Sequence, residues 1–258
     1  MKEGIEEAIR NANAQKDNVI GICLGMAGVD SPSDKAARIK WIHQILPHQP
    51  AIEIHNDGVI ALASGNGKLH GIVVISGTGC IVLGVKDGQH YRASGWGPIL
   101  GDEGSGFCLG QQAMKAVCNA EDGGPPTLLT GMLLKTLNLE NVRALIEWTY
   151  RDVTWARFAA LSNLVFEAAQ QNDTVALEIL NENAKALLSA IKLVYKKGGF
   201  NGKTPLVLSG GNLVHSNGTG IYAKTLSMLI QKEPNLELDV ILPSIVPSVA
   251  AALLAIQK

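Results

Sequence analysis

One carboxylate in the sequence lies where a general base would be useful. Asp57 follows the apolar run 51–55, which reads as a strand, and precedes a helix expected over 59–64. In α/β folds ligands bind at the carboxyl ends of strands, so Asp57 would face a ligand. There it could take a proton from a substrate hydroxyl. The alternative is that Asp57 only caps the helix that follows.

A glycine-rich turn, Ser76-Gly77-Thr78-Gly79, separates two short apolar runs. Glycines let the backbone approach an anion closely and direct its N–H groups at it, while Thr78 adds a hydroxyl. These features favour a phosphate-binding turn. The same residue types also make an ordinary β-turn, so the pattern alone leaves both interpretations open.

The segment 94–106, SGWGPILGDEGSG, places five glycines around one tryptophan and an Asp-Glu pair. Sugar hydroxyls need carboxylate acceptors, and the apolar face of a sugar ring needs a flat aromatic partner. With Trp96 and Asp102, the segment is a candidate sugar-binding loop. The alternative is that Asp102 and Glu103 only complement the positive end of a helix expected over 102–120.

A fourth cluster, Leu208-Ser209-Gly210-Gly211, ends a predicted strand in two glycines. Such an end suits the close approach of a nucleotide base or ribose. The sequence contains no G-x-G-x-x-G opening a βαβ unit, no G-x-x-x-x-G-K-[ST] and no G-x-S-x-G. A Rossmann site, a P-loop and a hydrolase nucleophile elbow are therefore excluded.

The elements that must position these clusters are those of an α/β chain, with an early and a late group of strands separated by helices. Strands are expected at 19–24, 51–55, 71–76, 81–85, 89–93, 206–208 and 237–242. Helices are expected at 3–15, 34–46, 59–64, 102–120, 126–137, 142–150, 155–171, 174–197, 220–232 and 246–257. Ser33 or Asp34 would cap the second helix, and Asp87-Gly88 predicts a tight hairpin turn. This grouping favours two lobes around a cleft.

The composition narrows the class of protein. The chain has 258 residues, with 22 Lys+Arg against 23 Asp+Glu and no basic stripe, which argues against nucleic-acid and membrane-surface binding. No apolar stretch reaches the ~20 residues that a bilayer requires, and the N-terminus does not resemble a signal peptide. We therefore expect a soluble, cytoplasmic protein. The four cysteines show no CxxC pair and no zinc spacing, so reduced thiols and no metal site are expected.

The four clusters, in this order, resemble the N-acetylglucosamine kinase family. This family belongs to the BadF/BadG-type ATPases, within the hexokinase–actin ATPase superfamily. The resemblance implies a ribonuclease-H-like fold with two lobes around a cleft for ATP and sugar. It implies a first lobe of residues 1–70 with 246–258 and a second lobe of residues 71–245. The similar segments are NDGVIALASG (56–65), VVISGTGC (73–80), SGWGPILGDEGSGFCLGQQA (94–113), RFAAL (157–161) and LVLSGGN (206–212).

By matching motif positions, the resemblance also implies roles for single residues. Asp57 corresponds to the base that accepts the proton of the sugar 6-hydroxyl. The other residues implied in sugar binding are Cys80, Ile81, Gly95, Trp96, Gly97 and Asp102. The residues implied in ATP binding are Gly77, Thr78, Gly79, Ala159, Gly211 and His215. The resemblance further implies ATP and Mg²⁺, an amino sugar as acceptor, and a homodimer.

Two departures from the family pattern bear on activity. The family begins with a strand, a DGGGT-type turn and a second strand that grip the triphosphate, and this segment is not found before the strand expected at 19–24. We therefore expect an N-terminally truncated first lobe and weak or no kinase activity, because each lost oxyanion contact typically costs about 10²–10³ in rate. Cys80 replaces the usual serine, and a thiol is a weaker donor to a sugar hydroxyl.

Two other functions stay open at the level of the sequence. The chain could be a non-catalytic sugar- or nucleotide-binding isoform that keeps the glycine-rich turn 76–79 and the candidate sugar-binding loop 94–106. It could also belong to the other branch of the family, the iron–sulfur ATPases that activate acyl-CoA dehydratases. That reading is disfavoured, because none of the four cysteines lies in an obvious paired motif.

Overall fold

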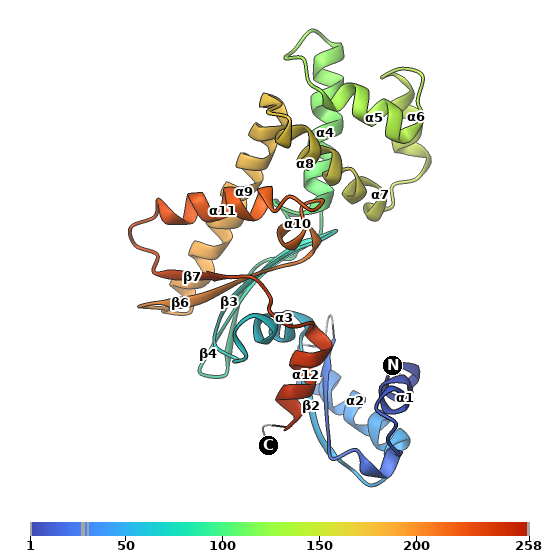
Figure 1. Ribbon diagram of the computed structural model, residues 1–258, viewed down its shortest axis with the longest axis vertical. Coiled ribbons are helices and arrows are strands. Elements are labelled where there is room, and N and C mark those ends of the chain that lie inside the picture. Colours follow the sequence, from blue (N-terminus) through green and yellow to red (C-terminus); the bar gives the residue numbers. More distant parts are fainter. Residues whose placement is uncertain (1, 27–28, 30, 257–258) are drawn as a thin grey trace. The chain divides into compact units, whose positions relative to one another are not determined.

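The computed structural model describes residues 2–26, 29 and 31–256 and divides the chain into two compact units. The first unit joins Met1–Leu69 to Ser244–Lys258, and the second comprises His70–Pro243 (Figure 1). The boundaries expected from the sequence, 70/71 and 245/246, lie next to these. Each unit has its own sheet and its own core and is described by itself.

The first unit is built around a sheet of two parallel strands with an apolar cluster on each face. Its elements are α1 (Lys2–Asn11), the 3-10 helix η1 (Lys16–Asn18), β1 (Gly21–Gly25), α2 (Pro32–Ile45), β2 (Ala51–His55), α3 (Asp57–Asn66) and α12 (Pro247–Ile256). On one face, Ile22, Leu24 and Ile54 pack with side chains of α1 and α2. On the other face, side chains of α3 and α12 pack beside Cys23.

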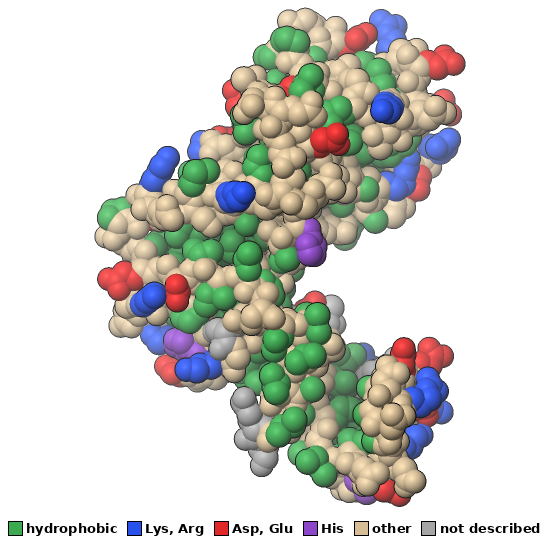
Figure 2. All heavy atoms as spheres, in the orientation of Figure 1, with side chains coloured by type: hydrophobic (Ala, Val, Ile, Leu, Met, Phe, Trp, Pro, Cys, Tyr) green, Lys and Arg blue, Asp and Glu red, His purple; other side chains and the backbone are tan. Residues whose placement is uncertain are grey.

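An open groove runs along β1. Within the described residues β1 pairs with β2 alone. The groove beside β1 has a volume of about 940 Å³ and is lined mostly by apolar side chains of α1, β1 and α12, including Ile5, Ile9 and Ile22. Ile20, just before β1, is 81% exposed, and Figure 2 shows further hydrophobic side chains gathered over α12. The first unit therefore leaves much apolar surface in water.

The second unit contains a mixed five-stranded sheet in the order β5-β4-β3-β6-β7. Its strands are β3 (Gly71–Ser76), β4 (Cys80–Lys86), β5 (Gln89–Ser94), β6 (Thr204–Ser209) and β7 (Leu238–Ile241). β3, β4 and β5 are antiparallel neighbours, whereas β6 is parallel to both β3 and β7. The Asp87-Gly88 turn has φ angles of 52° and 74°, which confirms the predicted tight hairpin turn. The predicted α/β class is confirmed.

One continuous apolar core joins this sheet to its helices. The helices are α4 (Gly106–Glu121), α5 (Leu129–Leu137), α6 (Ala144–Arg151), α7 (Trp155–Ala160), α8 (Ser162–Gln170), α9 (Thr174–Lys197), α10 (Gly211–Val214) and α11 (Ile221–Gln231). The bounds of α9 are confirmed, because both end signals are local: Asp173 caps the start by accepting from Ala176 N, and Gly198 ends the helix. No described helix is long and apolar enough to cross a membrane.

Two helical glycines provide a test of this packing. Gly110 on α4 is buried, and a Cβ there would collide with the backbone carbonyl of Phe158 on α7. Gly110→Ala should lower the free energy of unfolding by about 2 kcal/mol through overpacking. The control Gly131→Ala on α5 meets no atom within 4 Å and should raise it by up to about 1 kcal/mol through helix propensity. Denaturant unfolding measures both, and equal effects would contradict the close contact between α4 and α7.

The structure corrects the predicted start of α4. The helix begins at Gly106 instead of at 102, with Ser105 as its N-cap. Asp102 has a left-handed φ of 60° and belongs to the preceding loop. The predicted helix extends four positions too far, because Asp102 and Glu103 have the charge that favours a first helical turn but belong to the loop before α4.

Three smaller differences concern other helices. The helix expected over 155–171 is two helices, α7 and α8, that meet at Leu161. Ser31, instead of Ser33 or Asp34, caps α2, with its side chain accepting from Asp34 N. The short helix α10 was not predicted.

Candidate active site

The turn between β3 and β4 is fastened to the N-terminus of α4. Within the turn, Gly77 N donates to the Gly79 carbonyl at 2.9 Å. From α4, Gly106 N donates to the Gly77 carbonyl at 2.8 Å, and Phe107 N donates to the Thr78 carbonyl at 3.2 Å. The carbonyls of the turn thus point toward the helix, while Thr78 itself is exposed. A turn held from behind in this way can offer the Thr78 hydroxyl and the N–H groups other than that of Gly77 to an anion.

A buried asparagine, Asn212, joins the turn between β3 and β4 (residues 76–79, here called the phosphate turn) to the turn at Gly210 and Gly211 after β6. Because β3 and β6 are parallel neighbours, both turns lie at the same edge of the sheet. Asn212 Nδ2 donates to the Gly77 carbonyl at 2.8 Å and to Ser76 Oγ at 3.1 Å, and its Oδ1 accepts from Ser162 Oγ at 3.2 Å. Gly210 has a φ of 87° and lies against the backbone of Ser76, where a Cβ would collide. The two turns therefore form one surface.

Most residues implied in ATP binding lie on this surface. The phosphate turn contributes three of them, while Gly211 begins α10 and His215 ends it. A Cβ at Gly77 or at Gly211 would meet no atom within 4 Å, so both glycines leave open space above the backbone. His215 is exposed beside them in the chain. This arrangement can receive a phosphorylated ligand that lies along both turns.

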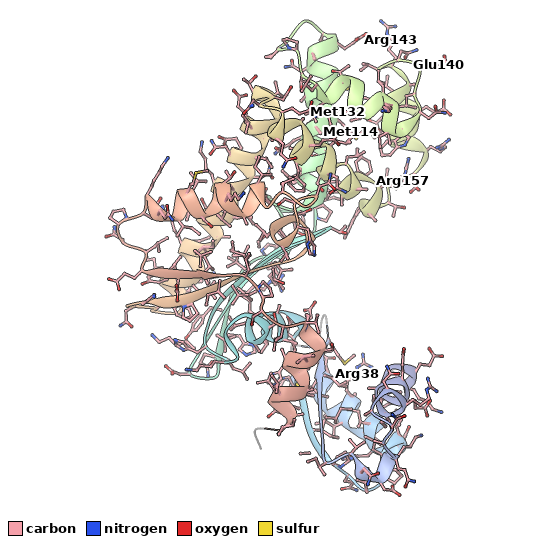
Figure 3. The ribbon with its side chains drawn as sticks, viewed as in Figure 1. Arg38, Met114, Met132, Glu140, Arg143 and Arg157 are labelled. Carbon is pink, nitrogen blue, oxygen red and sulfur yellow. The ribbon has the colours of Figure 1, made fainter. Side chains whose placement is uncertain are left out.

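Ala159 approaches the same region from α7. A Cβ on Gly106, which holds the phosphate turn, would lie 3.3 Å from the Cβ of Ala159. α7 is positioned by Arg157, which Figure 3 labels. Its guanidinium lies 4.0 Å from the ring centre of Trp148 and donates to the Trp148 carbonyl at 3.1 Å. Arg157 also pairs with Asp152 at 3.6 Å. The segment that carries Ala159 is thereby fixed behind the turn.

Asp102 is the buried carboxylate of the predicted sugar-binding loop, residues 94–106, here called the sugar loop. It is 5% exposed, its Oδ1 accepts from Gly97 N at 3.1 Å, and its Oδ2 accepts from Cys80 N at 3.5 Å. A Cβ on Gly79 would come within 2.8 Å of Oδ2. The alternative that Asp102 and Glu103 complement a helix N-terminus is wrong, because the first turn of α4 contains no acidic residue. Asp102 instead joins the sugar loop to the phosphate turn.

The sugar loop presents Trp96 to solvent. Trp96 is 69% exposed, and the Arg92 guanidinium lies 5.1 Å from its ring centre and donates to the Gly95 carbonyl. The φ angles of 75° at Gly95 and 88° at Gly97 favour glycine on both sides of the tryptophan. A Cβ on Gly95 would lie 3.1 Å from Ile81 Cδ1, so Ile81 supports the loop from below. An aromatic ring held in this way can stack on the apolar face of a sugar.

The Cys80 thiol contacts the sugar loop. Cys80 is buried, its Sγ lies 3.2 Å from Ser94 Oγ, and it donates to the Glu103 carbonyl at 3.2 Å. Burial raises the pKa of this thiol to about 12. The protonated thiol therefore supports the loop, and a direct contact of Cys80 with sugar stays a prediction.

The raised pKa of Cys80 predicts a slow thiol, because the thiolate is the reactive form. At pH 8 about one Cys80 in ten thousand is ionised, and this fraction rises about tenfold for each further pH unit up to the pKa. Alkylation by iodoacetamide, followed by mass spectrometry, should label the exposed Cys118 long before Cys80. Equal labelling of the two in the native chain would contradict the buried, protonated thiol.

A buried polar network that the sequence did not reveal centres on Gly104. Its carbonyl accepts from Ser76 Oγ at 2.6 Å and from Tyr222 Oη at 3.1 Å, and its N donates to Asn183 Oδ1 at 3.0 Å. Asn183 Nδ2 in turn donates to Gln112 Oε1 at 2.7 Å. Burial raises the pKa of Tyr222 well above its ordinary value, so the phenol stays a donor. The available signal was Asn183 itself, a polar residue on the buried face of α9.

Asp57 belongs to the first unit, whereas the other implied residues belong to the second. Asn56 caps α3 by accepting from Gly58 N at 2.9 Å, so the interpretation of Asp57 as the helix cap is wrong. Asp57 is the first residue of α3, is exposed, and its Oδ1 accepts from Gly58 N at 3.0 Å. It follows the carboxyl end of β2 directly. A carboxylate in this place is accessible to a hydroxyl of a ligand.

Comparison with known proteins identifies the family of this chain. The family model described as the BadF/BadG/BcrA/BcrD ATPase family matches residues 1–255. An N-acetyl-D-glucosamine kinase from Dictyostelium discoideum is 42% identical over 98% of this chain and 81% of its own length. The crystal structure of a Chromobacterium violaceum protein matches with a TM-score of 0.67 and 27% identity, covering 97% of this chain and 81% of that chain.

A second solved structure supports the fold alone. The ROK hexokinase from Thermus thermophilus has a TM-score of 0.55 and 16% identity, covering 98% of this chain and 83% of that chain. The chain therefore shares the fold of this hexokinase and of the Chromobacterium violaceum protein, as predicted. Because the family model matches nearly every residue and the Dictyostelium relative is similar along almost the whole chain, this protein belongs to the BadF/BadG/BcrA/BcrD ATPase family.

Proposed function

We propose that the protein transfers the γ-phosphoryl group of ATP to the 6-hydroxyl of N-acetyl-D-glucosamine. This proposal rests on one observation: the Asp102 carboxylate joins the sugar loop to the phosphate turn. It accepts hydrogen bonds from Gly97 N in the loop and from Cys80 N directly after the turn. Phosphoryl transfer depends mainly on holding the two reactants side by side, and binding segments joined in this way suit that need. The Dictyostelium kinase at 42% identity supports the choice of sugar.

In this mechanism each segment has a separate task. The phosphate turn and the turn after β6 orient the triphosphate, because their shared anchor, Asn212, prevents either from moving alone. The loop that carries Trp96 orients the sugar. Asp57 accepts the proton of the 6-hydroxyl as the oxygen forms its bond to the γ-phosphorus, and the bond from that phosphorus to the β–γ bridging oxygen breaks to release ADP.

Mg²⁺ fits this site as part of the substrate. The two turns carry the Thr78 hydroxyl and the His215 imidazole, and the buried Asp102 carboxylate already accepts from two backbone N–H groups. Mg²⁺ commonly keeps water and phosphate oxygens as ligands and needs few from the protein. We therefore infer that the ion arrives with ATP, where it neutralises charge on the triphosphate.

The decisive test is product formation by the purified chain. We expect ADP release that depends on both ATP and N-acetylglucosamine, with the 6-phosphate identified by mass spectrometry and NMR. Calorimetric titration should show that N-acetylglucosamine binds. Absence of both binding and product would overturn the proposal, as would phosphorylation at a different hydroxyl. The rate in the same assay also tests the expectation from the sequence that activity is weak.

The similarity to a sugar kinase favours this function over an iron–sulfur ATPase and over a non-catalytic isoform. A homodimer and a cytoplasmic location belong to the same proposal and rest on the family resemblance. Sedimentation of the purified chain would test the first of these.

A further inference from the structure

Three side chains with metal-binding chemistry meet on the sheet of the first unit. The parallel register of β1 and β2 places Cys23 opposite Glu53, and Gly25 opposite His55. Because side chains alternate along a strand, Glu53 and His55 lie on the same face of β2. Cys23 shares that face, the one that packs beside α3 and α12. Residues far apart in the sequence thus form one cluster.

The distances suit a single ion. One ligand atom each of Cys23, Glu53 and His55 lies within 4.8 Å of the other two. His55 Nε2 lies 3.0 Å from Glu53 Oε2. A tetrahedral zinc ion holds sulfur at about 2.3 Å and nitrogen and oxygen at about 2.0–2.2 Å, which puts neighbouring ligand atoms about 3.3–3.7 Å apart. Small side-chain rotations therefore bring the three ligand atoms to the separations that a bound ion requires.

The surroundings are shielded but not closed. The side chains of His55 and Glu53 are 18% and 17% exposed, and Cys23 is half-buried. The cluster is thus protected from bulk water yet still reachable by an ion. Cys23 also lines the apolar groove along β1, which keeps the protein around the sulfur low in polarity.

We propose that Cys23, Glu53 and His55 bind a divalent transition-metal ion of the zinc class, with the fourth position open to water. A sulfur and an imidazole ligand select such ions over Mg²⁺ and Ca²⁺, which prefer oxygen. A set of three protein ligands leaves one coordination position for solvent. The proposed ligands all belong to the first unit, and none of them is among the residues assigned to ATP or sugar binding.

Binding must remove one proton from the site. Burial and the nearby Glu53 carboxylate raise the pKa of the Cys23 thiol to about 11, so the thiol is protonated before the ion arrives. The ion replaces that proton on sulfur, and the proton passes to solvent. The hydrogen bond between His55 and Glu53 is replaced by two bonds to the metal, which keeps both side chains satisfied.

Cobalt titration of the chelator-treated full chain tests the site. Co²⁺ should bind one per chain, giving a thiolate-to-cobalt charge-transfer band and the strong visible bands of a tetrahedral ion. Zn²⁺ should displace it and Mg²⁺ should not. Cys23→Ser should abolish the charge-transfer band, whereas the control Cys118→Ser, which changes an exposed cysteine elsewhere, should leave it unchanged.

A second ligand keeps the test independent of whether Cys23→Ser folds. His55→Ala and the nearly isosteric Glu53→Gln, with folding checked by circular dichroism, should weaken Co²⁺ binding by about tenfold or more, since even outer-shell partners change metal affinity about 10–100-fold. Absence of a charge-transfer band in the unmodified chain would overturn the proposal. A band that survives Cys23→Ser would overturn it as well.

Discussion

Replacement of Asp57 by asparagine should lower the turnover number of sugar phosphorylation by about 10²–10⁴-fold, the usual contribution of a positioned general base. The amide cannot accept the proton of the 6-hydroxyl, so the attacking oxygen must lose it to water. Binding should change little, because an asparagine at this position keeps the size and the carbonyl oxygen of the side chain. The measurement is steady-state kinetics with both substrates varied, and the loss should fall on kcat and not on either KM.

The stability of the variant should stay within about 0.5 kcal/mol of the unmodified chain, as is usual for an exposed position. Asn56, not Asp57, supplies the cap of α3, so the helix keeps its N-terminal hydrogen bond. Asp34→Asn is the matched control, since Asp34 is an exposed carboxylate in the first turn of α2 in the same unit. If Asp57→Asn turned over at the unmodified rate, Asp57 would not be the base.

Replacement of Asp102 by asparagine should raise the KM for N-acetylglucosamine by about 100-fold and lower the free energy of unfolding by about 1–3 kcal/mol. The buried carboxylate accepts from Gly97 N and from Cys80 N, and an amide offers one oxygen where two are needed. The NH₂ group of the asparagine would face the N–H of either Gly97 or Cys80, and two donors repel each other. The sugar loop would therefore shift away from its position beside the phosphate turn. Kinetics and denaturant unfolding measure the two effects.

Glu103→Gln is the matched control for Asp102. The two residues are adjacent, but Glu103 is exposed whereas Asp102 is 5% exposed. The control should change neither the KM for sugar nor the stability by a measurable amount. A variant Asp102→Asn with unchanged sugar kinetics would show that the loop does not depend on this carboxylate.

The elements that the sequence predicted well are those with local signals at both ends. The strands at 51–55 and 71–76 and the helix at 174–197 have the predicted bounds. The start of α4 was missed because its determinant is distant: the left-handed Asp102 is held by bonds to Gly97 N and Cys80 N. Such a contact has no signature in a window of neighbouring residues.

The same distinction applies to the candidate sites. Glycine turns and carboxylates beside them can be found in the sequence because each segment carries its own chemistry. Asn212 and Tyr222 could not, because they act through distant partners: Asn212 bonds to Gly77 in the phosphate turn, and Tyr222 bonds to Gly104 in the sugar loop. Asn183 gave one signal, a polar side chain on the buried face of α9, but its partner Gly104 could not be predicted. The cluster of Cys23 and His55 escaped a search for metal-ligand spacing, because strand pairing, and not short spacing, brings it together.

The two units differ in how much core supports them, and this sets where the chain opens first. Among the described residues, the second unit contains a large continuous apolar cluster, whereas the clusters described in the first unit are small and lie beside the open groove along β1. Cooperative units with fewer buried contacts open at lower free energy. Amide hydrogens of β1 and β2 should therefore exchange with solvent sooner than those of β3 and β4. A ligand that binds only the second unit should not slow the exchange of the amide hydrogens in β1 and β2. Comparing the exchange rates of the two units with and without a ligand therefore shows which unit the ligand contacts.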